Sequence, residues 1–233
     1  MARKIRYTRK DLKGPDEFVS TLGKTTSWIS ANRYRVLAGC GVLLFLAGGI
    51  FGTLAWSRWQ ERKATQDLWP HLNRAREFLL APAQADEEKL ARLEQFLTAH
   101  VNMHPDTRAA EYARYYLGSI AFLRQNYDLS AHQFGQAIAA EKEADGLMPY
   151  LLRLGLAQAL EGKGDPASAG AYAEAAARAP GTETRVQAQL GQARSLAAAG
   201  RGPEAVAVYR TILQENPETP YRGLVEIQIA RAG

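Results

Sequence analysis

The chain is nearly devoid of cysteine. Its 233 residues include only Cys40, so a disulfide within the chain is excluded and the redox state of its compartment cannot be read from the sequence. The sequence after Trp59 also lacks the alternation of apolar and polar residues that is typical of β-strands. Alanine, leucine, glutamate, glutamine and arginine instead form helix-sized blocks, which predict an all-α protein.

An excess of charge of one sign is also missing from most of the chain. The net charge of +5 arises in residues 1–35, which hold nine lysines and arginines against three acids, whereas residues 57–233 are close to neutral. The larger part therefore lacks the basic face that nucleic-acid binding requires. The basic tail, with an amphipathic segment before the membrane, suits anionic lipid headgroups, and RNA-rich machinery is the alternative.

Signatures of catalysis, metal binding and cofactor binding are absent as well. His100 and His104 are four residues apart, but no carboxylate or cysteine completes a metal site, and we expect a solvated helix end there. Gly162-Lys163-Gly164 lacks the upstream glycine and the following serine or threonine of a phosphate-binding loop. The sequence thus predicts no enzyme activity, no metal and no cofactor.

One long apolar stretch organises the chain. Residues 36–56 contain no charge over 21 residues, and as a helix they span about 31 Å, which is enough to cross a bilayer. A cleaved signal would need a shorter apolar run and a small-residue cleavage site, and the lipoprotein-like residues 37–40 have the apolar run on the wrong side. We therefore expect a retained single-pass transmembrane helix.

The flanks of this stretch predict its orientation and its contacts. The charge of the whole tail places the N-terminus in the cytoplasm, although the basic residues nearest the two ends are almost balanced. Aromatic residues suited to the membrane interface are Trp28, Tyr34, Trp56 and Trp59. Gly48 and Gly52 form a GxxxG pattern, which is compatible with a homodimer packed through this face.

Helical blocks repeat through the second half of the chain. Aligned on their turns, the units begin near residues 111, 150 and 186, with a small residue such as Gly118 where two helices cross. The second unit has Ala173 where an aromatic residue is usual. Over residues 111–219 the chain resembles the tetratricopeptide repeat family, which implies an α-solenoid of helical hairpins. We expect residues 57–110 to form a linker helix and a divergent first pair, and residues 220–233 a capping helix.

The resemblance also implies a binding groove on the first helix of each repeat. The positions that commonly line it in this family fall on Tyr112, Tyr115, Ser119, Phe122, Gln158 and Arg194. The aromatic members would suit an extended peptide. The alternative is that two or three of them belong to the core between repeats.

The overall layout resembles the bacterial YfgM type of inner-membrane protein. That resemblance implies a cytoplasmic N-terminus, a periplasmic repeat domain, and a non-enzymatic adaptor that contacts a chaperone or client protein near the Sec translocon. The alternative is a scaffold subunit of an envelope assembly such as a secretion, pilus or division complex.

Overall fold

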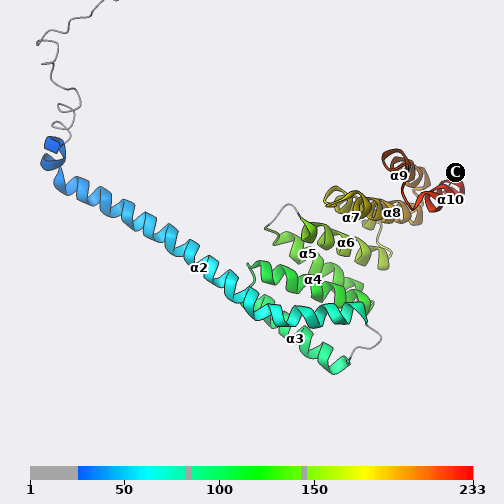
Figure 1. Cartoon of the computed structure of the whole chain (residues 1–233), viewed down its shortest axis with the longest axis horizontal. Helices are drawn as coiled ribbons and strands as arrows, with labels where there is room; N and C mark the ends of the chain where they lie inside the picture. Colours follow the sequence, from blue (N-terminus) through cyan, green and yellow to red (C-terminus); the bar gives the residue numbers. More distant parts are fainter. Residues whose placement is uncertain (1–25, 82–85, 143–145, 233) are drawn as a thin grey trace, which may run out of the picture. The chain divides into compact units, whose positions relative to one another are not determined.

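A computed structural model describes residues 26–81, 86–142 and 146–232, and this part of the chain is entirely helical (Figure 1), which confirms the predicted all-α class. The chain divides into two compact units, of which the first ends at Arg58 and the second begins at Trp59. The basic residues and the amphipathic segment predicted within residues 1–25 lie outside the described part.

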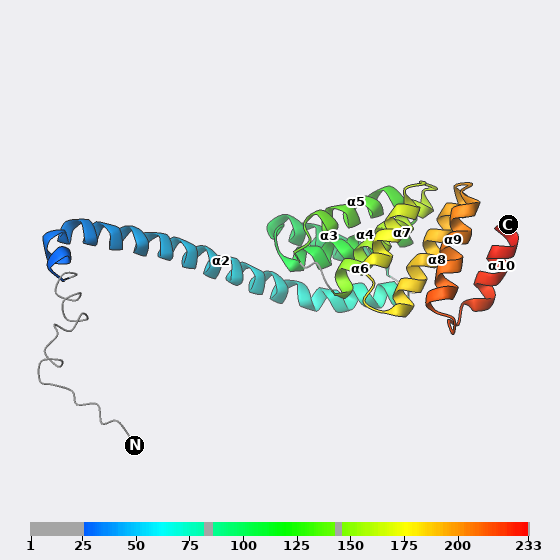
Figure 2. The ribbon, with the colours of Figure 1, turned by 90° about the horizontal axis from the view of Figure 1, so that it is seen from above.

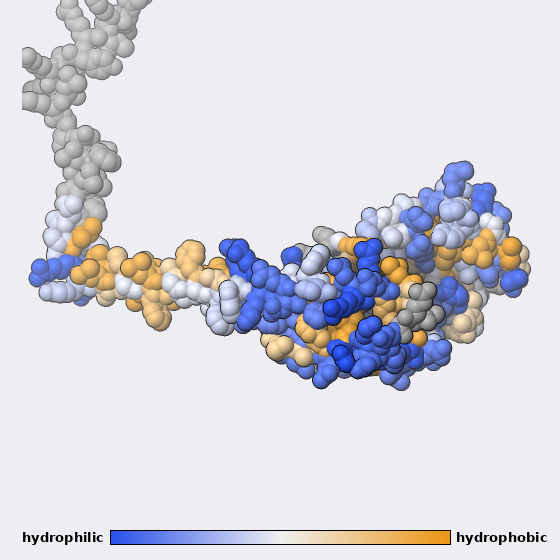
Figure 3. Space-filling model, turned by 60° about the horizontal axis from the view of Figure 1, so that its bottom comes forward, coloured by the Kyte–Doolittle hydropathy of each residue, from blue (hydrophilic) through white to orange (hydrophobic). Residues whose placement is uncertain are grey.

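The first unit exposes its apolar residues. Helix α2 (Arg33–Leu80) is the helix long and apolar enough to cross a membrane, and its apolar window has no buried residue. Leu44 and Phe45 are 74% and 82% exposed, and apolar residues cover the N-terminal half of α2 in Figure 3. Large exposed apolar surfaces of this kind mark sites of contact with a membrane or with another protein.

The predicted interface aromatics all have exposed side chains. Trp28 lies in the helical residues 26–31, and Tyr34 contacts the Arg33 guanidinium through its ring face, 5.0 Å from the ring centroid. Trp56 is exposed, and Lys63 lies 5.3 Å from the centroid of the Trp59 ring. A Cβ added at Gly48 or Gly52 would meet nothing within 4 Å, so a homodimer through these glycines stays a prediction.

Helix α2 continues without a break from the apolar stretch into the second unit. The predicted linker helix and the first helix of the divergent pair are therefore one element. Pro70 lies inside this helix, where it cannot donate a hydrogen bond to the preceding turn. Ala64, Leu68 and Ala75 provide the buried stripe that holds residues 59–80 in the second unit.

The second unit stacks helical hairpins one on the next (Figure 2). After α2 come α3 (Glu87–Met103), α4 (Arg108–Leu123), α5 (Tyr127–Ala139), α6 (Leu147–Gly162), α7 (Ser168–Ala177), α8 (Thr182–Ala198), α9 (Gly202–Glu215) and α10 (Arg222–Ala232). From α3 on, each helix packs against the next in sequence, and α4 also contacts α6. This pattern of neighbour-only contacts is that of an α-solenoid.

Three turns between paired helices share one hydrogen-bonded motif. After α4, the backbone N–H of Asn126 donates to the Ala121 carbonyl at 2.9 Å and that of Gln125 donates to the Phe122 carbonyl at 2.8 Å. The same two bonds recur around Gly164 and Gly200, which have φ of 72° and 76°, while Gln125 has 58°. This C-terminal cap needs a left-handed residue at its centre, which is why glycine recurs.

Aromatic rings of the second helix fit against glycines of the first helices. Phe134 of α5 lies against Gly118, as the sequence predicts, and against Gly155 of the next hairpin, where an added Cβ would come within 2.4 Å of the ring. In the second repeat the aromatic ring that packs on glycine is Tyr172, and not a residue at position 173. A Cβ added at Gly191 would come within 2.4 Å of the Tyr172 ring. Each ring therefore ties its own hairpin to the following one.

The expectation of a solvated helix end is wrong for His100. Its side chain is 1% exposed, beside Phe96 at 5.9 Å and His104 at 5.0 Å between ring centroids. Burial, and then the neighbouring His104, lower the pKa of His100. The hydrophobic cluster of the first hairpin extends to this end of α3, so the histidine is part of the core.

Replacing Gln125 by glycine should stabilise the solenoid. A non-glycine residue in the left-handed region costs about 1 kcal/mol, so Gln125→Gly should raise the melting temperature by about 2–4 °C. Circular dichroism of the full chain in a mild detergent measures this. Gly164→Ala is the matched control and should shift melting downward; equal effects of both substitutions would contradict the role of the turn.

The buried His100 should make stability depend on pH. Because its pKa is lower in the folded chain than its ordinary 6.5, the unfolded chain takes up the proton first. The contribution of neutral His100 to the free energy of unfolding is complete above about pH 6.5. As the pH falls towards the pKa of His100 in the folded chain, this contribution decreases by up to about 1.4 kcal/mol per pH unit.

Denaturant unfolding at pH 7.5 and 5.5 should therefore show a smaller loss of stability for His100→Phe than for the parent chain. Gln136→Ala, at an exposed position on α5 without a titratable group, is the control and should leave the pH dependence unchanged. An unaltered pH dependence in His100→Phe would assign the effect to other groups.

Candidate functional site

A cleft opens between the first helices of three successive hairpins. Its volume is about 340 Å³, and its lining comes from α2, from the start of α4 and from Met148 at the start of α6. Trp69 and Tyr112 on its wall are 65% and 42% exposed, whereas most other large apolar residues of the hairpins are packed inside. Exposed aromatic rings beside a recess are the usual anchors of a protein interface.

A cluster of tyrosines lies beside this cleft. The Tyr115 and Tyr116 rings meet edge to face with centroids 5.3 Å apart. Burial, with the neighbouring Tyr115 and Tyr112, raises the pKa of Tyr116, while Arg76 of α2 opposes this rise. Three phenol rings and a guanidinium thus lie near one another on α2 and α4, and together they offer both apolar contact and hydrogen-bond donors.

One carboxylate fixes the two helices of the cleft relative to each other. Glu61 of α2 accepts a hydrogen bond from the backbone N–H of Arg108 at the first turn of α4, with donor–acceptor distances of 2.9 and 3.2 Å to its two oxygens. A negative charge at this position also complements the helix dipole. The wall that carries Trp69 is thereby anchored to the wall that carries Tyr112.

The aromatic residues predicted for the groove fall into two environments. Tyr112 is exposed at the cleft. Tyr115 is half-buried, lies 6.1 Å from Phe134 between ring centroids and belongs to the core between hairpins. Phe122 is half-buried and packs edge-on against Tyr127 of α5 at 5.6 Å. The Ser119 hydroxyl donates to the Tyr115 carbonyl at 2.8 Å.

The remaining two predicted residues lie on later hairpins. Gln158 is exposed on α6. Arg194 of α8 forms a two-pronged ion pair with Glu161, at 2.6 and 2.8 Å, and Tyr172 donates to the same carboxylate at 2.6 Å. The structure therefore uses Arg194 to join two hairpins, and its guanidinium is already engaged.

The electrostatics of this network favour the ion pair. Burial alone would raise the pKa of Glu161, but hydrogen bonds from Arg194 and Tyr172 outweigh it and lower that pKa. Burial and the hydrogen bond to Glu161 raise the pKa of Tyr172, so its hydroxyl stays protonated and acts as a donor. The carboxylate is thus ionised and fully partnered, which is the state of a structural link rather than of an acid–base catalyst.

The cleft has the chemistry of a binding surface. Within residues 26–81, 86–142 and 146–232, no group of three or more histidine, cysteine or acidic side chains could hold a metal ion. The polar groups lining the cleft are an arginine, a threonine and two glutamates, and Glu61 is bound to a helix end. Apolar contact is therefore the main interaction that the cleft offers.

Sequence reasoning missed Trp69, Leu72 and Met148, which share the cleft with Tyr112. The repeat alignment starts at residue 111, so it contains no position for the two residues on α2. A signal was present: Leu68, Trp69 and Leu72 form a short apolar stripe at helical spacing within an otherwise polar stretch. Met148 follows Leu147 at a helix start, where alignment on the turns is least accurate.

Comparison with known families supports the solenoid. The sequence model of the tetratricopeptide repeat family matches residues 154–220, from within α6 to the loop before α10. Comparison with curated proteins and with solved structures gave no match. The family match, together with the stacked hairpins, confirms the predicted fold of tetratricopeptide-like repeats, which generally mediate protein–protein interaction.

Proposed function

We propose that the chain is a single-pass membrane adaptor that binds a protein partner through the cleft between α2, α4 and α6. The observation that carries this proposal is the exposure of Trp69 and Tyr112 around one recess. Tryptophan and tyrosine are enriched among residues that dominate binding energy, and burying them in a partner would remove a large apolar area from water. Met148 adds a side chain that adapts to differently shaped partners.

The partner binds as an apolar segment rather than as a charged one. Beyond the cleft, the predicted groove supplies the exposed polar residues Gln158 and Arg194, and the Arg194 guanidinium is already paired with Glu161. The cleft is lined by one arginine and two glutamates, and Glu61 is bound to the first turn of α4. Affinity therefore comes from the aromatic anchors, and the surrounding contacts exclude water.

The membrane segment restricts where the adaptor works. We propose that residues 36–56 cross the bacterial inner membrane with the N-terminus in the cytoplasm and the repeats in the periplasm, as the positive charge of residues 1–35 favours. The tail then contacts anionic headgroups. In this setting the partner is a chaperone or client protein near the Sec translocon, as the resemblance to the YfgM type implies.

Photo-crosslinking tests the cleft. With benzoylphenylalanine in place of Trp69, we expect a discrete set of protein adducts in intact cells, including a translocon subunit or a periplasmic chaperone. Tyr112→Ala should reduce these adducts about thirtyfold, because an anchor of this kind contributes about 2 kcal/mol. The melting temperature of the Tyr112→Ala variant should equal that of the parent chain, because the Tyr112 side chain is 42% exposed.

Leu129 of α5 provides the matched control, since it is apolar and 43% exposed but does not line the cleft. The same adducts from position 129 would contradict the cleft as the binding site. One stoichiometric envelope partner without any translocon component would favour the scaffold function instead.

Enzyme fusions at two positions of the chain test the proposed membrane orientation. Alkaline phosphatase depends on disulfides that form outside the cytoplasm, so a fusion after Gly233 should be active and a fusion after Arg35 inactive. Enzyme activity normalised to the amount of fusion protein is the measurement. The reverse pattern would place the repeats in the cytoplasm.

A further inference from the structure

A second cavity lies between α2 and α3, on the side of α2 turned away from the cleft. Its volume is about 670 Å³, within the range of pockets that hold small ligands. His71, Arg74 and Phe78 recur at helical spacing along α2 and face this cavity, whereas Trp69 and Leu72 face the other. The two recesses therefore use different faces of one helix.

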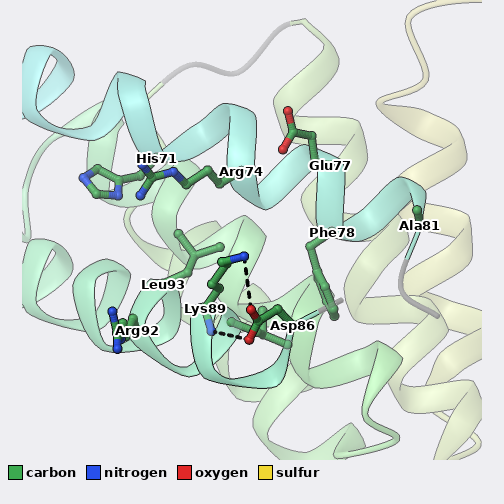
Figure 4. Close-up of a pocket in the computed structure, with 10 residues that line it drawn as sticks. His71, Arg74, Glu77, Phe78, Ala81, Asp86, Lys89, Arg92 and Leu93 are labelled. Carbon is green, nitrogen blue, oxygen red and sulfur yellow. Dashed lines mark hydrogen bonds and ion pairs between the residues drawn. The ribbon is translucent and has the colours of Figure 1, made fainter. Parts of the chain in front are cut away.

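Apolar side chains form one part of this cavity, whereas six of its ten lining residues are ionisable. Phe78 of α2 and Leu90 and Leu93 of α3 form its floor, and Figure 4 shows Phe78 and Leu93 directed into the space between the helices. His71 stacks on Phe96 with ring centroids 3.6 Å apart, so it presents an aromatic wall. Such a surface favours a hydrocarbon chain over a polar molecule.

Arg74 supplies one cation that has no partner. Within the described residues it makes no hydrogen bond or ion pair, whereas Lys89 is bound to Asp86 at 3.1 Å and Arg92 to Glu88. Figure 4 shows the Arg74 side chain running back towards His71 and the Glu77 carboxylate pointing away from Lys89 and Asp86. Burial, and then Arg74, lower the pKa of His71, which places the two groups within electrostatic reach.

We propose that this cavity binds a long-chain fatty acid, with its carboxylate at Arg74 and its chain against Phe78 and Leu93. A carboxylate pairs with guanidinium through two parallel hydrogen bonds. A peptide suits the cavity less well because both walls are helices whose backbone groups are already paired. The peptide's own amide groups would be left without partners against an apolar floor.

Photolabelling of the full chain in native membranes tests this site. A diazirine-bearing long-chain fatty acid should label peptides within residues 71–93, and unlabelled hexadecanoate should compete while hexadecanol competes at least tenfold less. Arg74→Gln should reduce labelling of these peptides about tenfold, since a hydrogen bond to a charged group contributes that much. Arg74→Lys, which keeps the charge, should retain part of the labelling.

Arg62→Gln is the matched control, because Arg62 is an exposed arginine of α2 that lies outside the cavity. A second readout comes from His71: a carboxylate bound beside it should raise the pKa of its imidazole, measured by NMR. Labelling confined to the apolar residues 36–56, equal competition by the alcohol, or labelling unchanged in Arg74→Gln would each overturn the proposal. The crosslinks from position 69 should persist in Arg74→Gln, so failure of this site is distinguishable from failure of the cleft.

Discussion

The fit of an aromatic ring against glycine is the constraint on which the stacked hairpins depend. Phe134 lies where any Cβ at Gly155 would collide with its ring, and Tyr172 does the same at Gly191. The close approach brings helix backbones near enough for the alanines around them to be fully buried, as Ala137, Ala157 and Ala193 are. A methyl group at either glycine would push two hairpins apart and lose these contacts together.

Charged links reinforce the same stacking at the edges of the core. Arg153 of α6 binds Glu141 through two bonds of 2.9 and 2.8 Å and also donates to the Pro149 carbonyl, with both side chains about nine-tenths buried. Arg194 and Glu161 do the same between the second and third repeats. Because each such pair is matched by geometry as well as charge, it fixes the register of one hairpin on the next. The polar residues of the solenoid are therefore largely committed to structure, and the exposed aromatic residues remain for binding.

The helical class, the repeats and the position of Gly118 could be predicted from the sequence because they follow from composition, turn residues and period. The environment of individual side chains could not. Tyr112 and Tyr115 are three residues apart on one helix and look equivalent in an alignment, but only the packing of α5 decides that Tyr115 is covered by Phe134. Tyr172 takes the aromatic position one residue before the place where the alignment puts Ala173, and only its contact with Gly191 reveals this. The burial of His100 could not be predicted from the sequence either, because it depends on the α2 residues that pack around it.

The neighbour-only packing of the hairpins also determines where the solenoid opens first. Within the described residues, helix α10 lies at one end of the stack and has most of its contacts with α9, and Leu224 and Ile227 on it are about half exposed. Because no further hairpin covers it there, we expect its amides to exchange with solvent without disturbing the inner hairpins. Opening then passes inward one helix at a time, and among the described residues Arg194–Glu161 is the first ion pair between different helices that it meets. The free energy of local opening therefore differs along the described part of the solenoid, and it is lowest at the C-terminal helix α10.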